Sequence, residues 1–247
     1  VLGVHMEAPF LSPEKAGAQR SGFFALPNEE NWQRYTGGYA SVVKLVTLAP
    51  ELSGTKEMVA LLAAQGIAVS AGHTTATAEQ LHQAADWGLN HATHLFNAQP
   101  PLNHRAPGVA GAALTDDRIY CEMIADGVHL HPDILRLIYF CKGKEKTVLI
   151  TDAMEAAGMP DGVYQLGGQP VTVKDGAARL ADGTLAGSTL TLARAVTNLI
   201  GYGIAPEDAA YMASKAPAMS LGLEEYGEIR KGKPAVFVRY NNQWEFV

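Results

Sequence analysis

The first 153 residues alternate short apolar runs, rich in Val and Ile, with stretches of helical character. This alternation is typical of parallel βα units, in which each strand is followed by a crossover helix. Six strands are predicted, at residues 2–6, 42–48, 67–71, 90–95, 119–124 and 148–151. Helices are expected over 56–65 and 77–87, the second with Thr77 and Gln80 placed for a capping box. The pattern therefore restricts the chain to an α/β fold with a parallel sheet.

Two architectures fit this pattern. A closed parallel barrel ordinarily has eight strands, so six are too few. A doubly wound open sheet fits the count, but it should carry a Gly-rich phosphate turn, and neither GxGxxG nor GxxxxGK[ST] occurs. Periodicity alone supports the two architectures about equally.

The sequence pattern changes after Gly158. Gly-Gly and Asp-Gly turn signals separate short alternating runs, which predicts antiparallel hairpins inserted at about 160–185. Helices are expected again over 189–200, 206–213 and 216–221. The last residues, 233–247, predict two strands around an Asn-Asn turn that belong to a small β-layer.

Composition excludes several classes of function. A length of 247 residues with 47% hydrophobic content suits one large barrel domain. The net charge of -6 argues against a nucleic-acid partner. Cys121 and Cys141 are the only cysteines, which favours a reducing compartment, and we expect the cytoplasm. No apolar run approaches the roughly 18 residues of a membrane span, so no membrane partner is expected.

Polar residues at the strand ends favour the barrel. Glu7, His73, His94 and Asp152 each fall at or just beyond the carboxyl end of a different predicted strand, which is the edge where barrels build their active sites. Two imidazoles and a carboxylate suit Zn²⁺ or Fe²⁺, and a further Asp is a natural base for water. The pattern indicates metal-assisted hydrolysis.

Each of these residues also has a plainer interpretation. A lone His at a strand end is more often packed or at the surface than a ligand, and Asp152 could cap a turn. The convergence of four residues, not any single one, favours the site. Two loops have the composition of ligand-binding loops: the Asn97 and Ala98 amides with Arg105 could hold a phosphate, and the small residues of GTLAGST precede a predicted helix. Either could equally be a polar surface loop.

Seven segments, read in order, carry a resemblance. They are HMEAPF, VSAGHTTAT, THLFNAQ, PGVAGAAL, IADGVH, LITDAMEAAG and GTLAGSTLTL. Together they resemble the N-acetylglucosamine-6-phosphate deacetylase family of the amidohydrolase superfamily, over nearly the whole chain. The resemblance implies a metal-centred (β/α)₈ barrel, a small β-sandwich, and hydrolysis of N-acetylglucosamine 6-phosphate to acetate and glucosamine 6-phosphate in amino-sugar catabolism.

The resemblance also implies roles for individual residues. It makes Glu7, His73 and His94 the ligands of a divalent metal, Zn or Fe, and Asp152 the catalytic acid/base. It further implies a homodimer in which Arg105 reaches the substrate phosphate, either in its own active site or in that of the neighbouring subunit. The substrate-binding set is Ala18, Gln19, Asn97, Ala98, Arg105, Asp126, His129, Leu185, Ala186 and Gly187.

This chain departs from the family pattern in extent and at two positions. The family's Glu ends the third barrel strand, so the chain is expected to lack the first two βα units, with the barrel over 1–225 and strands of the β-sandwich over 226–247. Ala8 stands where the family usually has Gly, and Gln19 stands where the family commonly has His. Gln can donate a hydrogen bond as His does, but it cannot carry a proton. The alternatives are the galactosamine epimer or another small amide as substrate, or an inactive, incomplete fragment that binds sugar phosphate.

Overall fold

The computed structural model describes residues 1–244 and 247, and its larger sheet has six strands. Their order is β1-β2-β3-β4-β5-β6, with parallel pairing from β1 to β5. The strands are β1 (Val4–Met6), β2 (Val43–Leu48), β3 (Ala68–Ala71), β4 (His91–Ala92), β5 (Tyr120–Ile124) and β6 (Thr147–Ile150). Sequential order with parallel pairing is the arrangement of a TIM-like fold, and all six predicted strands are confirmed in place.

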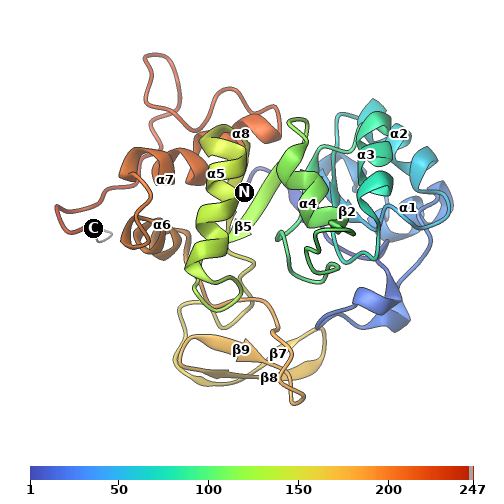
Figure 1. Ribbon diagram of the computed structural model, residues 1–247, viewed down its shortest axis with the longest axis horizontal. Coiled ribbons are helices and arrows are strands. Elements are labelled where there is room, and N and C mark those ends of the chain that lie inside the picture. The colour runs from blue at the N-terminus through green and yellow to red at the C-terminus, as the bar shows by residue number, and fades with distance from the viewer. Residues whose placement is uncertain (245–246) are drawn as a thin grey trace. The chain divides into compact units, whose positions relative to one another are not determined.

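A helix connects each strand to the next. These are α1 (Glu29–Thr36), α2 (Thr55–Ala64), α3 (Ala78–Trp87), α4 (Gly108–Thr115) and α5 (Pro132–Lys146), with short 3₁₀ turns at Pro13–Lys15, Ser21–Phe23 and Ala40–Val42. Neighbouring crossover helices α2 and α3 lie side by side (Figure 1). The capping box predicted at the start of α3 is present, because Thr77 accepts from the Gln80 amide and Gln80 from that of Thr77.

The fourth strand is much shorter than predicted. Sequence periodicity suggested residues 90–95, but β4 ends at Ala92. His94, Phe96 and Ala98 then take left-handed backbone conformations, with φ of 30°, 76° and 49°. A left-handed residue cannot continue a ladder, so the chain turns immediately after the strand. The residues predicted to extend this strand instead form a buried turn.

The remaining elements follow β6. The predicted hairpins are confirmed as an antiparallel sheet of β7 (Gly162–Leu166), β8 (Gln169–Lys174) and β9 (Ala177–Arg179). Helix α6 (Leu192–Gly201) begins three residues later than predicted, because Thr191 caps it. Helices α7 (Pro206–Ala213) and α8 (Lys215–Ser220) follow. Residues 226–244 contain no strand, so the β-sandwich expected there stays a prediction, and residues 245–246 lie outside the described part.

The chain divides into two compact units, Val1–Cys121 and Glu122–Val247, and each has its own buried side chains. Val46, Leu48 and Val69 are fully buried in the first unit, and Met123 and Leu135 in the second. Burial of such side chains stabilises a fold by roughly 1.5–3 kcal/mol each.

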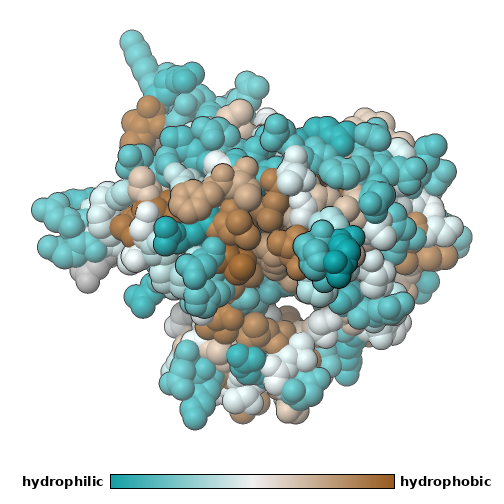
Figure 2. All heavy atoms as spheres, in the orientation of Figure 1, coloured by the Kyte–Doolittle hydropathy of each residue, from teal (hydrophilic) through white to brown (hydrophobic). Residues whose placement is uncertain are grey.

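Some large hydrophobic side chains stay exposed. They include Tyr39 and Phe23 in the first unit and Phe140 and Ile229 in the second. Figure 2 shows hydrophobic patches among the hydrophilic side chains that dominate this face. Among the described residues, no helix combines the length and the apolar character that crossing a membrane requires.

Candidate metal centre and its surroundings

Strand register brings three predicted site residues to one edge of the first unit. Leu48 pairs with Ala71, and Ala71 pairs with Ala92, so β2, β3 and β4 end in line. His73 and His94 each follow their strand by two residues, and Glu7 directly follows β1. Both histidines have positive φ, of 45° and 30°, which turns the chain at this edge. The predicted convergence is therefore found for these three of the four side chains, and that of Asp152 stays a prediction.

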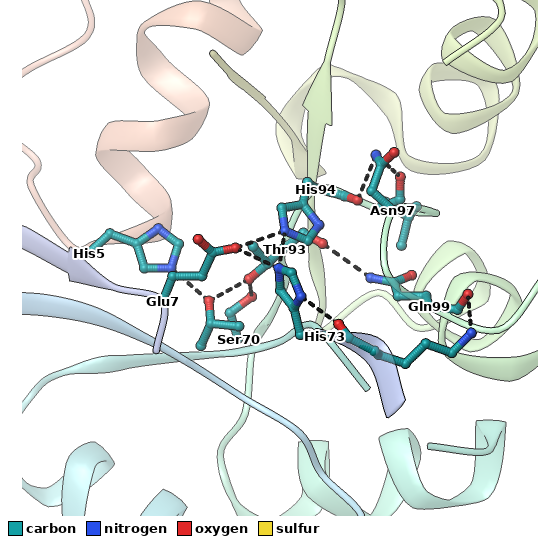
Figure 3. A network of polar contacts seen from close by, with 11 residues as sticks. His5, Glu7, Ser70, His73, Thr93, His94, Asn97 and Gln99 are labelled. Carbon is teal, nitrogen blue, oxygen red and sulfur yellow. Dashed lines mark hydrogen bonds and ion pairs between the residues drawn. The ribbon is translucent and has the colours of Figure 1, made fainter. Parts of the chain in front are cut away.

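The three side chains meet at a single carboxylate oxygen. The Nε2 atoms of His73 and His94 each lie 2.9 Å from Glu7 Oε1, and 3.1 Å from each other. Figure 3 shows both imidazole rings turned toward the Glu7 carboxylate. The two rings are nearly perpendicular, at 78°. Among the described residues this is the one group of three or more His, Cys, Asp or Glu side chains whose ligand atoms could surround a metal ion.

The hydrogen bond at Nδ1 of His73 determines whether its Nε2 atom carries a proton toward Glu7. His73 Nδ1 lies 2.7 Å from the carbonyl oxygen of Lys15, and because a carbonyl only accepts, Nδ1 carries the proton. In the neutral ring Nε2 then presents a lone pair to an oxygen that also presents lone pairs. Such a contact is repulsive unless a cation or a second proton lies between the atoms. The donor set therefore fits a divalent cation, and two imidazoles with one carboxylate suit Zn²⁺ or Fe²⁺.

The electrostatics of Glu7 agree with this. Burial opposes ionisation of the Glu7 carboxyl group, but its interactions with the adjacent His73 and His94 side chains outweigh this effect, so the pKa of Glu7 lies well below its ordinary value. The carboxylate is thus charged at neutral pH. Both imidazoles are buried, while Glu7 keeps 29% of its side chain exposed. An anionic ligand with an open side is what a substrate-binding metal centre requires.

Hydroxyl groups tie four strands together beside this cluster. Thr93 Oγ1 contacts Thr47 Oγ1 at 2.7 Å and Ser70 Oγ at 2.5 Å, and Thr47 also contacts His5 Nε2 at 2.7 Å (Figure 3). A Cβ on Gly72 would lie 2.7 Å from the Thr47 methyl group, so only glycine allows this close approach. The strand ends that carry the cluster are therefore joined by side chains as well as by the sheet.

The loop after His94 is held by its own polar groups. Asn97 Nδ2 donates to the carbonyl of His94 at 3.1 Å, and Ala98 accepts from the Thr74 amide at 3.1 Å. Gln99 is buried; its amide group donates to the carbonyl of Thr93 and accepts from the amide of Phe96, both at 3.1 Å. Two of the predicted substrate-binding residues, Asn97 and Ala98, thus border the cluster.

Three other predicted substrate-binding residues of the first unit lie in irregular segments. Ala18 and Gln19 follow the 3₁₀ turn that ends at Lys15, whose carbonyl binds His73. Arg105 is exposed in a tight turn closed by a bridge between Asn103 and Ala106. The structure records no contact between the Arg105 side chain and the cluster, so its phosphate role stays a prediction.

The second unit contains a separate pair of titratable side chains. Asp126 follows β5 by two residues, and its Oδ2 lies 2.6 Å from His129 Nδ1, while its Oδ1 accepts from the amides of Val128 and His129. Burial raises the pKa of Asp126, but hydrogen bonds from His129 and its amide outweigh this effect and lower the pKa overall. Asn198 of α6 donates to the Ala125 carbonyl at 2.8 Å and holds the loop. The pairing of Asp126 with His129 was not predicted from the sequence, and the binding of sugar by these residues stays a prediction.

Asp152 lies beside the predicted small-residue loop of its own unit. It follows β6 by two residues with φ of 49°, and its carbonyl accepts from the Ser188 amide at 2.7 Å. Gly187 packs against the same carbonyl, where an added Cβ would come within 3.0 Å. Ala186 is buried and bonds to Ala178, and Leu185 bridges to Arg179. The structure therefore joins Asp152 and the Leu185–Gly187 segment.

Sequence reasoning missed the groups that support these residues. The Lys15 carbonyl carries no side-chain signal at all. Gln99, which the sequence analysis did not select, makes two hydrogen bonds within its loop. Glu51 binds the two residues that follow His73. Glu51 could have been found, because it lies three residues beyond the end of β2, at the same edge as the ligands.

A parallel βα sheet with a cluster of candidate metal ligands at its strand ends is the arrangement of metal-dependent hydrolases with a TIM-like fold. Comparison with known families agrees: the model of the Amidohydrolase family matches residues 1–247. The chain belongs to this family, whose members depend on metal, and the Glu7, His73 and His94 cluster could hold that metal.

Individual relatives are more specific. The chain is 41% identical to an N-acetylglucosamine-6-phosphate deacetylase of Bacillus subtilis (strain 168) over 252 residues, covering all of this chain and 63% of the relative. It is 40% identical to an N-acetylgalactosamine-6-phosphate deacetylase of Escherichia coli O157:H7, covering 96% and 63%. The chain thus spans about three-fifths of the length of these relatives.

A solved structure agrees with the sequence comparisons. A variant of N-acetyl-D-glucosamine-6-phosphate deacetylase from Mycobacterium smegmatis, in complex with N-acetyl-D-glucosamine-6-phosphate, superposes with a TM-score of 0.93 and 38% identity, covering 99% of this chain and 65% of that one. The resemblance predicted from seven sequence segments is therefore confirmed.

Proposed function

We propose that this chain carries the metal-dependent deacetylation of an N-acetylated amino-sugar 6-phosphate, which gives acetate and the free amine. The observation that carries the proposal is the convergence of His73 Nε2, His94 Nε2 and Glu7 Oε1, in which a ring nitrogen without a proton faces a carboxylate. The relatives named above, at 40–41% identity, support the choice of substrate.

Glu7, His73 and His94 would hold the divalent cation, Zn²⁺ or Fe²⁺. When bound, the cation supplies Lewis acidity toward the amide carbonyl and makes water a better nucleophile. The carboxylate neutralises part of its charge, and the Lys15 carbonyl keeps the His73 lone pair directed at it. These residues orient and retain the cation without exchanging protons with substrate.

Asp152 is the residue proposed to move protons. It accepts a proton from the attacking water as the carbon–oxygen bond forms, and returns it to the nitrogen as the carbon–nitrogen bond breaks. The bond from the Ser188 amide to the Asp152 carbonyl fixes the backbone at this position. Replacing Asp152 with Asn should leave Zn²⁺ content unchanged and lower turnover by roughly 10²–10⁴-fold, which single-turnover acetate assays measure.

Binding of the sugar phosphate is assigned to residues around these centres. Asn97 and Ala98 lie on the rigid loop after His94, and Ala18 and Gln19 follow the turn that holds His73. Arg105 would meet the phosphate, in this subunit or in a partner of a homodimer. In the second unit, Asp126 orients His129, and the segment Leu185–Gly187 presents small residues and backbone amides.

A second substrate is favoured by one specific observation. The Escherichia coli relative, at 40% identity, is an N-acetylgalactosamine-6-phosphate deacetylase. The two sugars differ only in the configuration of one hydroxyl group, so the preference depends on the residues that hydrogen-bond this group, for which Gln19 is a candidate.

Acetate release from each of the two epimers tests the proposal. The unchanged chain is assayed with and without Zn²⁺, and the His73→Ala variant is assayed in parallel as the control. We expect release that requires the metal and that His73→Ala loses, with the faster epimer identifying the substrate. Release that His73→Ala retains would remove the cluster from the reaction, and no release from either epimer would overturn the activity proposed for this chain.

A further inference from the structure

Glu51 binds the segment that immediately follows His73. Its Oε1 accepts from the Thr75 amide at 2.7 Å and from the Thr75 hydroxyl at 2.9 Å, and its Oε2 accepts from the Thr74 hydroxyl. Three donors from two consecutive residues therefore converge on one carboxylate. Charge-assisted hydrogen bonds of this kind are about twice as strong as neutral ones.

The segment needs such a restraint because His73 is in an unfavourable conformation. Its φ of 45° lies in the left-handed region, which is strained for a residue other than glycine. Further contacts hold the same turn: the His73 carbonyl accepts from the Ser12 amide at 2.9 Å, and the Thr74 amide donates to Ala98 at 3.1 Å. Glu51 adds the restraint on the C-terminal side of the turn.

Glu51 is itself held on a fixed support. It lies between β2 and α2, where the Ala49 amide donates to the Phe10 carbonyl at 2.9 Å. The Ala49 carbonyl in turn accepts from the Leu52 amide at 3.1 Å and the Thr55 hydroxyl at 3.2 Å. The carboxylate thus connects the end of β2 to the turn after β3, and any movement of Glu51 would move the backbone of His73.

We propose that Glu51 is a positioning residue for the metal centre: its carboxylate clamps Thr74 and Thr75 and so holds His73 in the orientation that binds the cation. The inference rests on the metal site of the proposed function. Glu51 is not one of the three side chains whose ligand atoms cluster at the metal site. It acts through the backbone, whereas the Lys15 carbonyl acts on the His73 ring directly.

The dissociation constant for Zn²⁺, measured on the whole chain by competition with a chromogenic chelator, tests this role. We expect Glu51→Ala to weaken binding by roughly 10–100-fold, the usual effect of removing an outer partner of a ligand. Glu51→Gln should weaken it less, because its amide oxygen still accepts from Thr75 while its amide nitrogen faces Thr74. Glu30→Ala, an exposed carboxylate on α1, is the matched control and should bind as the unchanged chain does.

Two further variants separate positioning from general stability. Thr36→Val removes a buried hydrogen bond within α1, in which the Thr36 hydroxyl donates to the Trp32 carbonyl. This variant should lower the Tm without changing Zn²⁺ affinity. Should Glu51→Ala fail to fold, Thr75→Val replaces it, with Thr75→Ser as the variant that keeps the hydroxyl. Thr75→Val should weaken Zn²⁺ binding and Thr75→Ser should restore it.

The outcomes distinguish the inference from the proposed function. Zn²⁺ binding by the unchanged chain together with equal affinity in Glu51→Ala, or in Thr75→Val if that variant is used, would overturn the role of Glu51 and leave the metal site intact. Affinity that falls equally in Thr36→Val would also overturn it, since the effect would then follow stability. No Zn²⁺ binding by the unchanged chain would overturn the metal site and this inference together.

Discussion

The two units each contain a carboxylate bound to histidine, but the two groups differ in the nitrogen used. In the first unit, Glu7 Oε1 faces the Nε2 atoms of His73 and His94, residues 66 and 87 positions away. In the second, Asp126 Oδ2 faces the Nδ1 atom of His129, three residues away, and Oδ1 is occupied by two amides. The first group therefore converges on a point between side chains, and the second closes on itself.

This difference shows how the same residue types acquire different chemistry. The Nε2 atoms of two histidines that follow neighbouring strands can both face one carboxylate oxygen. A cation bound between these atoms would remove the repulsion between their lone pairs. In the short-range pair, the proton on Nδ1 is bound to Asp126, so the pair fixes the His129 tautomer and leaves the Nε2 atom without a proton in the neutral ring. We infer that the first group binds metal and the second positions a single imidazole.

The largest expected effect separates the two groups by metal affinity. His73→Ala removes one of three ligands and should weaken Zn²⁺ binding by more than the roughly 10–100-fold typical of outer partners, whereas His129→Ala should leave it unchanged. Chelator competition on both variants measures the difference. Equal losses would contradict the distinction drawn here.

A second prediction concerns the long-range support of the first group. Thr93→Val removes the hydroxyl shared by Thr47 and Ser70 and leaves buried groups without that partner, so the free energy of unfolding should fall by about 1–3 kcal/mol. Thr115→Val, at an exposed position at the end of α4, is the matched control and should change it by under about 0.5 kcal/mol. Urea denaturation gives both values, and similar losses would show that the hydroxyl layer adds nothing specific.

A third prediction tests whether Asp126 fixes the His129 ring. In Asp126→Asn the amide nitrogen can face His129 only if Nδ1 accepts, so the ring should change tautomer, at a cost of about 1 kcal/mol in stability. Nitrogen-15 NMR of the His129 ring reports the tautomer directly. An unchanged tautomer would mean that other groups orient the ring.

The smallest effect is the pH dependence of that cost. The pKa of Asp126 is lowered in the folded chain, so its contribution is fully present above the ordinary value of 3.8 and is lost as the pH falls through the lower folded value. The gap in unfolding free energy between the unchanged chain and Asp126→Asn should therefore narrow below about pH 3.8. A gap that stays constant down to pH 3 would place the stabilisation in the amide bonds alone.

Sequence periodicity predicted the parallel sheet because strands β2 to β6 are mostly buried and their sequences are largely apolar. It overextended β4, since Leu95 is as apolar in a buried turn as in a strand. The rule that sites gather at strand ends predicted that Glu7, His73 and His94 lie close together, and the strand register explains why they do, while the same prediction for Asp152 stays open. Glu51 and the Lys15 carbonyl escaped because their role depends on contacts over 24 and 58 residues.

The positions of the three candidate ligands also set an order in time. Residues 7, 73 and 94 all belong to the first unit, while Asp152 is 58 residues further along. A ribosome therefore completes the cation-binding set before it adds the residue proposed to move protons. The availability of the metal during translation, and not only after release of the finished chain, therefore bears on whether the proposed site acquires its metal.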